Sequence, residues 1–147
     1  MQSGFTPKEL HFSDEGRSKL IKGIRKIATA VKSTLGPRGN TVLIESPEHL
    51  HGITVTKDGV TVAKSISLLD PVENLAVRMM KEAADRTATS AGDGTTTAIV
   101  LAEALVSAGT EMIEPTTNRT EVLRHLVNET KEISKKLKLD GKKLGID

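Results

Sequence analysis

Apolar residues recur three and four positions apart along most of this chain, which is the spacing of α-helices with one buried face. The clearest stripe consists of Leu20, Ile24, Ile27, Val31 and Leu35. Gly36-Pro37 follows it, and proline disfavours helix in the residue that precedes it. The sequence therefore predicts a helix that ends near Gly36 and starts at Ser13, with Ser13 or Asp14 as its cap.

Two further helices are predicted in the middle of the chain. Pro71 stands near the start of the first, where proline is tolerated, and Gly92 ends it. The second runs from Thr95 to about Ala108 and ends at Gly109. It is apolar almost all round, so we expect it to be central and buried.

A last amphipathic helix is predicted up to about Leu137, with Thr117 or Asn118 as a possible cap. The basic tail 138–147, which contains two glycines, is more typical of a connector than of a core. Residues 40–46 and 52–59 are β-branched and predict a β-hairpin, followed by a short helix or irregular linker over 60–67. The expected fold is mainly α, a helical bundle with one small hairpin.

Composition narrows the class of protein. The 147 residues are 37% hydrophobic and 27% charged, without a run of 18 apolar residues, so we expect a globular chain and no membrane helix. The 21 basic and 19 acidic residues are interleaved, and Phe5 and Phe12 are the sole aromatic residues. Nucleic-acid binding is therefore not expected. The absence of cysteine fits a reducing compartment, and we expect a cytoplasmic location.

The most informative stretch is Gly-Asp-Gly-Thr-Thr-Thr at 92–97, just where a helix begins. The first turn of a helix leaves backbone N–H groups unpaired, and glycine lets an anion approach them. The hydroxyls of Thr95, Thr96 and Thr97 add donors. Asp93 would repel a phosphate unless Mg²⁺ lay between them. The alternative is that Asp93 only caps the helix.

Two other glycine-marked junctions could contribute to the same site. Asp58, in Lys57-Asp58-Gly59, is either a turn-forming residue or a carboxylate that orients an attacking water in phosphoryl transfer. Lys57 is either a solvated lysine or a positive charge near phosphates. Thr-Leu-Gly-Pro-Arg-Gly at 34–39 is either a helix stop or a loop that lines a nucleotide.

Taken together, the three junctions closely resemble those of the group I chaperonins (the Hsp60/GroEL family), from about Lys8 to about Leu137. The resemblance implies an equatorial-domain-like fold, here incomplete, with residues 1–137 as the N-terminal segment of an ATP-binding domain and 138–147 as a connector to an intermediate domain. It also implies ATP and Mg²⁺ as ligands, with K⁺ as a further candidate.

The resemblance assigns a role to each junction. Thr34, Leu35, Gly36 and Pro37 match a nucleotide-contacting loop. Lys57 matches an ATP contact, and Asp58 matches the catalytic acidic residue. Asp93 matches the Mg²⁺ ligand, and Gly94, Thr95, Thr96 and Thr97 match the phosphate loop.

The resemblance also implies partners. Members of the family assemble into rings of like subunits, in which residues 40–56 match a stem-loop that pairs with a neighbouring subunit. Members run several times longer, and their other domains bind unfolded proteins and a co-chaperonin. We therefore expect a chaperonin ATPase segment that is inactive alone. The alternative is a non-catalytic module that self-associates or pairs with a full-length chaperonin.

Overall fold

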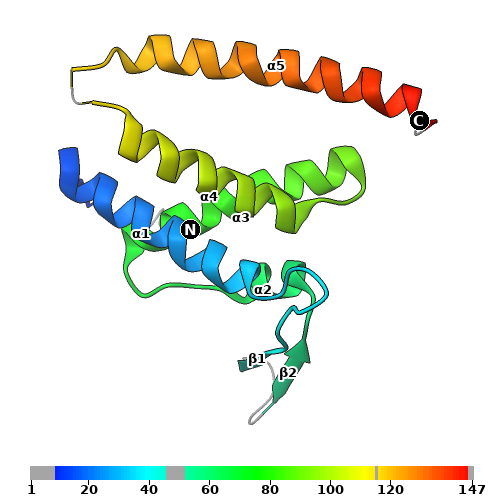
Figure 1. Cartoon of the computed structure of the whole chain (residues 1–147). Coiled ribbons are helices and arrows are strands. Elements are labelled where there is room, and N and C mark those ends of the chain that lie inside the picture. Colours follow the sequence, from blue (N-terminus) through cyan, green and yellow to red (C-terminus); the bar gives the residue numbers. More distant parts are fainter. Residues whose placement is uncertain (1–8, 46–51, 115, 146–147) are drawn as a thin grey trace, which may run out of the picture. The chain divides into compact units, whose positions relative to one another are not determined.

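The computed structural model describes residues 9–45, 52–114 and 116–145. Within these ranges the chain forms five helices and one two-stranded sheet (Figure 1). In chain order they are α1 (Ser13–Lys32), β1 (Val42–Glu45), β2 (Ile53–Thr56), α2 (Gly59–Ser65), α3 (Pro71–Ala91), α4 (Thr95–Met112) and α5 (Arg119–Lys143). The prediction of a mainly α fold with one hairpin is confirmed.

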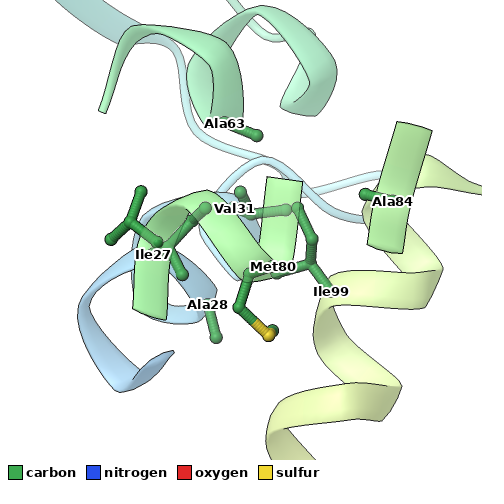
Figure 2. Packing of buried hydrophobic residues seen from close by; sticks show 8 residues of the cluster. Ile27, Ala28, Val31, Ala63, Met80, Ala84 and Ile99 are labelled. Carbon is green, nitrogen blue, oxygen red and sulfur yellow. The ribbon is translucent and has the colours of Figure 1, made fainter. Parts of the chain in front are cut away.

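The chain divides into two compact units, an N-terminal unit (Met1–Ala108) and a C-terminal unit (Gly109–Asp147). The N-terminal unit has a hydrophobic core to which four helices contribute (Figure 2). The core cluster consists of Ile27, Ala28 and Val31 from α1, Ala63 from α2, Val77, Met80 and Ala84 from α3, and Ile99 from α4. The four helices that flank the glycine-marked junctions are thus packed on one another.

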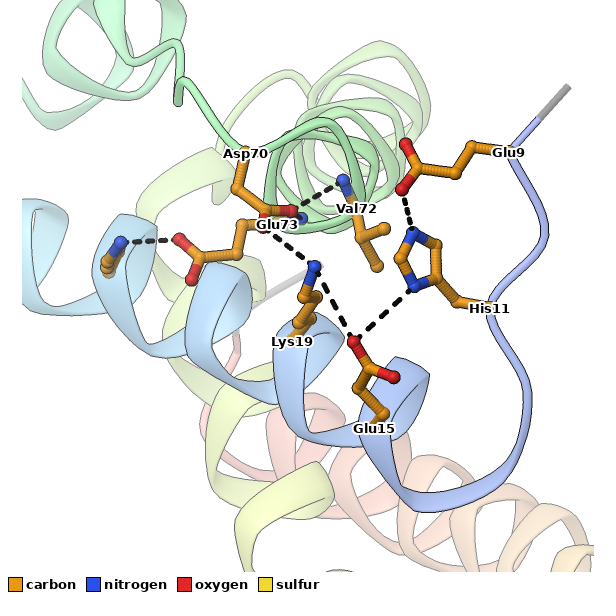
Figure 3. Close-up of polar contacts among 8 residues, drawn as sticks. Glu9, His11, Glu15, Lys19, Asp70, Val72 and Glu73 are labelled. Atoms are coloured by element: carbon orange, nitrogen blue, oxygen red, sulfur yellow. Dashed lines mark hydrogen bonds and ion pairs between the residues drawn. The ribbon is translucent and has the colours of Figure 1, made fainter. Parts of the chain in front are cut away.

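Helices α1 and α3 approach each other closely at Gly23. A Cβ on Gly23 would lie 2.3 Å from the carbonyl oxygen of Glu73, so a larger residue would force the helices apart. Lys26 pairs with Glu73 across the same contact. Lys19 lies 3.1 Å from Asp70 at the start of α3 (Figure 3). Close backbone packing and two ion pairs therefore fix α1 against α3.

The ends of α3 agree with the sequence pattern. Pro71 occupies the first turn, and Gly92 ends the helix in the left-handed region, with φ 79°. Asp70 was not predicted as the cap, yet its side chain accepts hydrogen bonds from the backbone N–H groups of Val72 (2.9 Å) and Glu73 (3.1 Å). These bonds satisfy two of the unpaired donors in the first turn.

The start of α1 differs from the prediction that Ser13 or Asp14 caps the helix. Phe12 occupies the cap position, and no side chain of the described residues caps the helix. Ser13 is already helical by hydrogen bonding and has a φ of 54°. The Asp14 carboxylate accepts a hydrogen bond from Arg17 instead. Its position in the first turn still places negative charge at the positive end of the helix dipole.

Two predictions for α4 were wrong. The helix does not end at Gly109 but continues to Met112, because Gly109 keeps helical geometry and its carbonyl accepts from Ile113 N–H. Nor is α4 buried all round, since only Thr95 and Ile99 of this helix are buried. Leu101 and Leu105 are more than half exposed, because only the first turns of α4 reach the core cluster.

The predicted hairpin is confirmed. Strands β1 and β2 pair antiparallel, with Val42 opposite Thr56 and Glu45 opposite Ile53. The predicted hairpin tip, residues 46–51, lies outside the described residues. Leu43 and Val55 are largely exposed on the strands. Pairing of this sheet with another subunit stays a prediction.

Helix α5 makes up most of the C-terminal unit. Asn118 caps it, as predicted, by accepting from the N–H groups of Thr120 and Glu121. The helix continues past Leu137 to Lys143, so the first residues of the predicted connector are helical. None of the α5 residues is buried. The domain division after residue 137 stays a prediction. Among the described helices, none is long and apolar enough to cross a membrane.

Candidate functional site

The first junction is a tight loop that follows α1. Gly36 adopts a φ of 76°, which favours glycine, and a Cβ on Gly39 would lie 2.2 Å from the carbonyl oxygen of Thr34. The Thr34 hydroxyl donates to the last turn of α1 at 2.8 Å. Within the described residues, no donor bonds the carbonyl oxygens of Thr34, Leu35 or Pro37. These carbonyls are available to a ligand.

The second junction places Asp58 as the cap of α2. One carboxylate oxygen accepts from Val60 N–H at 3.2 Å, and the other accepts from Thr61 N–H at 2.9 Å and from the Thr61 hydroxyl at 2.6 Å. The Thr61 hydroxyl, followed by the Thr61 N–H, holds the pKa of Asp58 below its ordinary value. Asp58 is therefore an ionised, fixed and exposed carboxylate at neutral pH. Lys57 beside it is exposed.

The third junction is the turn between α3 and α4. Gly92 and Gly94 have φ values of 79° and 97°, and the Gly94 carbonyl accepts the first helical bond of α4 from Ala98 at 2.8 Å. In the described part of the chain, the backbone N–H groups of Thr95, Thr96 and Thr97 have no hydrogen-bond acceptor. Three parallel donors at the positive end of a helix suit an anion.

Asp93 does not cap α4, which was the alternative interpretation of this residue. Its Oδ1 accepts from the adjacent Gly94 N–H at 2.6 Å and not from the first turn of the helix. The side chain is exposed beside the three free N–H groups. Asp93 is therefore free to bind a ligand, while the helix start remains open to an anion.

Gly59 brings the three junctions together. It follows Asp58 directly and is buried. A Cβ on Gly59 would lie 2.6 Å from the Thr96 hydroxyl oxygen and 2.9 Å from the Thr34 hydroxyl oxygen. Residues that are far apart in the sequence thus meet at one backbone position. The sequence predicted the three junctions, and the structure shows this contact between them.

The donor set fits a metal–phosphate group better than a bare metal ion. Among the described residues, no three or more His, Asp or Glu side chains converge as metal ligands. Mg²⁺ commonly takes one or two carboxylates and completes its shell with substrate phosphates and water. One carboxylate at Asp93, beside unpaired N–H groups that can donate to phosphate, matches that arrangement.

Sequence reasoning missed two residues of this region. In the sequence Gly59 only marked a junction, although its lack of a side chain permits the contact between junctions. Thr61 was not considered, although it holds Asp58 through two hydrogen bonds. The signal was present, because Asp-Gly-Val-Thr has the spacing of a cap and the third helical residue.

Comparisons with known proteins identify the family. The model of the TCP-1/cpn60 chaperonin family matches residues 27–145, a range that includes all three junctions. The chain therefore belongs to the TCP-1/cpn60 chaperonin family. The resemblance that the three sequence motifs indicated is confirmed at the level of the chaperonin family.

One solved relative is the chaperonin gp146 from the bacteriophage EL 2 (Pseudomonas aeruginosa), crystallised in the presence of ATP-BeFx. In one crystal form the identity is 35% and the TM-score 0.62, over 69% of this chain. In another crystal form the identity is 34%, with the same TM-score and coverage. The chain spans 18% of the length of gp146.

Proposed function

We propose that this chain forms the phosphate-binding part of a chaperonin ATP site. The observation that carries the proposal is the contact of Gly59 with the hydroxyls of Thr34 and Thr96. This contact assembles a loop with free carbonyls, a fixed carboxylate and an open helix start. The phage chaperonin gp146, which shares the fold and 35% of the matched residues, was crystallised with ATP-BeFx, a finding that supports the same ligand class here.

In the proposed mechanism the three junctions have different tasks. The N–H groups and hydroxyls of Thr95, Thr96 and Thr97 donate to phosphate oxygens, and Gly94 leaves the backbone open to them. Asp93 would hold Mg²⁺, which when bound neutralises the charge that develops on the phosphates. The loop Thr34–Pro37 lines the nucleotide through its carbonyls, and Lys57 adds a positive charge.

Asp58 is the proposed catalytic residue. Its lowered pKa keeps the carboxylate ionised, so that it can accept a hydrogen bond from the attacking water and orient it. Its bonds to Val60 and Thr61 fix the side chain before the water arrives. The chain spans only 18% of gp146, so we propose that hydrolysis, ring assembly with like subunits, and action on unfolded proteins and a co-chaperonin require further parts of a chaperonin.

Isothermal titration with Mg-ATP tests the proposal. We expect the wild-type chain to bind, and Asp93→Ala to weaken binding at least about tenfold, because even residues that only support a metal ligand contribute 10- to 100-fold to metal affinity. EDTA should weaken wild-type binding and leave the residual binding of Asp93→Ala unchanged. Failure of the wild type to bind, or equal affinity with and without metal, would contradict the proposal.

A second test uses Gly59. In Gly59→Ala the new Cβ would collide with the hydroxyls of Thr34 and Thr96, so we expect weaker Mg-ATP binding. The matched control is Gly109→Ala, where the new Cβ would lie 3.7 Å from the nearest atom, an ordinary van der Waals distance. Both variants add one methyl group to a helix. Equal affinities for the two variants would show that the contact at Gly59 does not build the site.

The alternative function is a non-catalytic module that self-associates or pairs with a full-length chaperonin. The favouring observation is that β1 and β2 form a sheet of only two strands in the described chain, with Leu43, Ile53 and Val55 exposed. Two strands alone are marginally stable in water. Size-exclusion chromatography with light scattering, alone and with a full-length chaperonin, tests this function. A folded monomer that ignores the chaperonin would rule it out.

A further inference from the structure

Lys81 joins α3 to the end of α2. Its side-chain Nζ donates to two carbonyl oxygens, those of Lys64 in the last turn of α2 and of Ile66 just after it, each at 2.7 Å. The last carbonyl groups of a helix receive no hydrogen bond from within the helix, so other donors must satisfy them. One amine on α3 therefore holds the C-terminal end of α2.

The other end of α2 carries Asp58. The helix has seven residues, so its two ends lie only roughly 10 Å apart at 1.5 Å per residue. Val62 and Ala63 are buried on its inner face, and Gly59 contacts the first and third junctions. A helix this short has little stability of its own, so loss of the anchor at its C-terminal end would loosen the whole helix, including the first turn that holds Asp58.

The Lys81 amine is partly buried, which is unfavourable for a charged group. Burial lowers the pKa of Lys81, because removing the ammonium from water costs free energy. A lysine side chain often packs its aliphatic part against the protein and keeps its ammonium group in water. Here the amine bonds two backbone carbonyls instead, and this requires a specific geometry between α3 and α2.

We propose that Lys81 is a positioning residue, which holds Asp58 in place by fixing the C-terminal end of α2 against α3. The catalytic role of Asp58 rests on the function proposed above, but the mechanical link between Lys81 and Asp58 does not. The test below uses no nucleotide. Failure of the link and failure of ATP binding are therefore separate results.

The decisive comparison is between Lys81→Met and Lys81→Arg. Methionine has a similar length and no donor, whereas arginine keeps the charge and the donors. Lys22→Met is the matched control, because Lys22 is exposed on α1 and its amine has no hydrogen bond or ion pair with a described residue. It removes one positive charge without touching α2.

Two readouts report on Asp58 directly. Carboxyl carbon NMR follows the titration of Asp58, and amide hydrogen exchange follows Val60 and Thr61, the residues that donate to it. In Lys81→Met we expect the pKa of Asp58 to rise toward its ordinary value and exchange at these amides to accelerate about tenfold or more. Lys81→Arg should restore both signals, and Lys22→Met should change neither.

Wild-type titration and exchange at Asp58, Val60 and Thr61 in a folded Lys81→Met variant would overturn the proposal. If Lys81→Met does not fold, Lys81→Gln replaces it, because glutamine keeps one donor group on a shorter stem. It should shift both signals in the same direction. Unchanged signals in Lys81→Gln would overturn the proposal equally.

Discussion

The N-terminal and C-terminal units are built on different principles. The core of the N-terminal unit includes Ile27 and Val77, whose side chains are 0% exposed. The α5 helix of the C-terminal unit has no buried residue, and Leu123 and Ile133 are both more than half exposed. The first unit is held by tertiary packing, whereas α5 depends on its Asn118 cap and short-range pairs such as Lys135–Glu132.

This difference explains where the candidate site lies. Its three junctions connect helices that share one core, so the positions of Thr34, Gly59 and Thr96 are fixed by packing. A ligand site gains from such rigidity, because less entropy is lost when the ligand binds. A helix such as α5 offers no comparable support.

The largest effect on stability is expected when a core residue of the N-terminal unit is truncated. The same truncation in the C-terminal unit serves as the comparison. Ile27→Ala should lower the free energy of unfolding by about 2–5 kcal/mol, because it removes a fully buried side chain and leaves a cavity. Ile133→Ala, at 57% exposure, should change it by no more than about 0.5 kcal/mol. Urea denaturation of both variants measures the difference. Similar losses would contradict the contrast between the units.

The next largest effect on stability is expected at two glycines that lie within helices. Gly23→Ala should destabilise the protein by about 1–3 kcal/mol, because the new Cβ would meet the Glu73 backbone, which cannot move aside without shifting α3. Gly109→Ala should stabilise by about 0.5–1 kcal/mol, because alanine favours helix and its Cβ would have room. Thermal unfolding by circular dichroism should give shifts of opposite sign, and a stabilised Gly23→Ala would refute the close contact.

A smaller effect is expected from pH. The Glu73 N–H, with further help from Lys19, lowers the pKa of Asp70 below its ordinary value of 3.8. The stability that Asp70 contributes is therefore fully present above pH 3.8 and is lost as the pH falls through the lower value of the folded state. The α5 cap, Asn118, does not titrate.

The pH effect is measured by comparing Asp70→Asn with the wild type in urea denaturation between pH 7 and pH 2. Asparagine is also a good cap but does not titrate, so the variant should lose less stability in acid than the wild type. Asp140→Asn, on the exposed α5, is the control and should leave the acid response unchanged. An identical response in Asp70→Asn and wild type would show that this cap does not link stability to pH.

The smallest effect is expected at an ion pair of α5. Lys135 lies 2.7 Å from Glu132, and both side chains are largely exposed. Lys135→Ala should change the free energy of unfolding by less than about 0.5 kcal/mol, because water and salt screen such pairs. Urea denaturation at low and high salt checks this. A larger loss would indicate that α5 has tertiary contacts in solution.

Local signals in the sequence predicted much of this fold. The spacing of apolar residues predicted α1, although the helix ends at Lys32 and not near Gly36, and Pro71 and Gly92 marked the ends of α3. Gly109 misled the prediction, because glycine commonly ends a helix by adopting the left-handed conformation, and here it stays helical. The exposure of α4 was also missed, because an apolar sequence does not say which surfaces find a partner.

The residues of the candidate site were predictable from their motifs, and the resemblance implied that the three junctions share one site, but the contact that joins them was not predicted. The motifs pointed to Asp58, Asp93 and the threonines after it. That Gly59 contacts both Thr34 and Thr96 is a tertiary fact without a local signal. Lys81 was invisible for the same reason, because its acceptors lie 17 and 15 residues away along the chain.

The proposed function requires that the three junctions form one phosphate-binding site. Amide chemical shifts of the labelled chain, followed during titration with Mg-ATP, test it most directly. We expect signals from 34–39, 57–61 and 93–97 to shift together along one binding curve, while those of α5 stay unchanged. Shifts at only one junction, at different concentrations for each, or chiefly in α5 would contradict it.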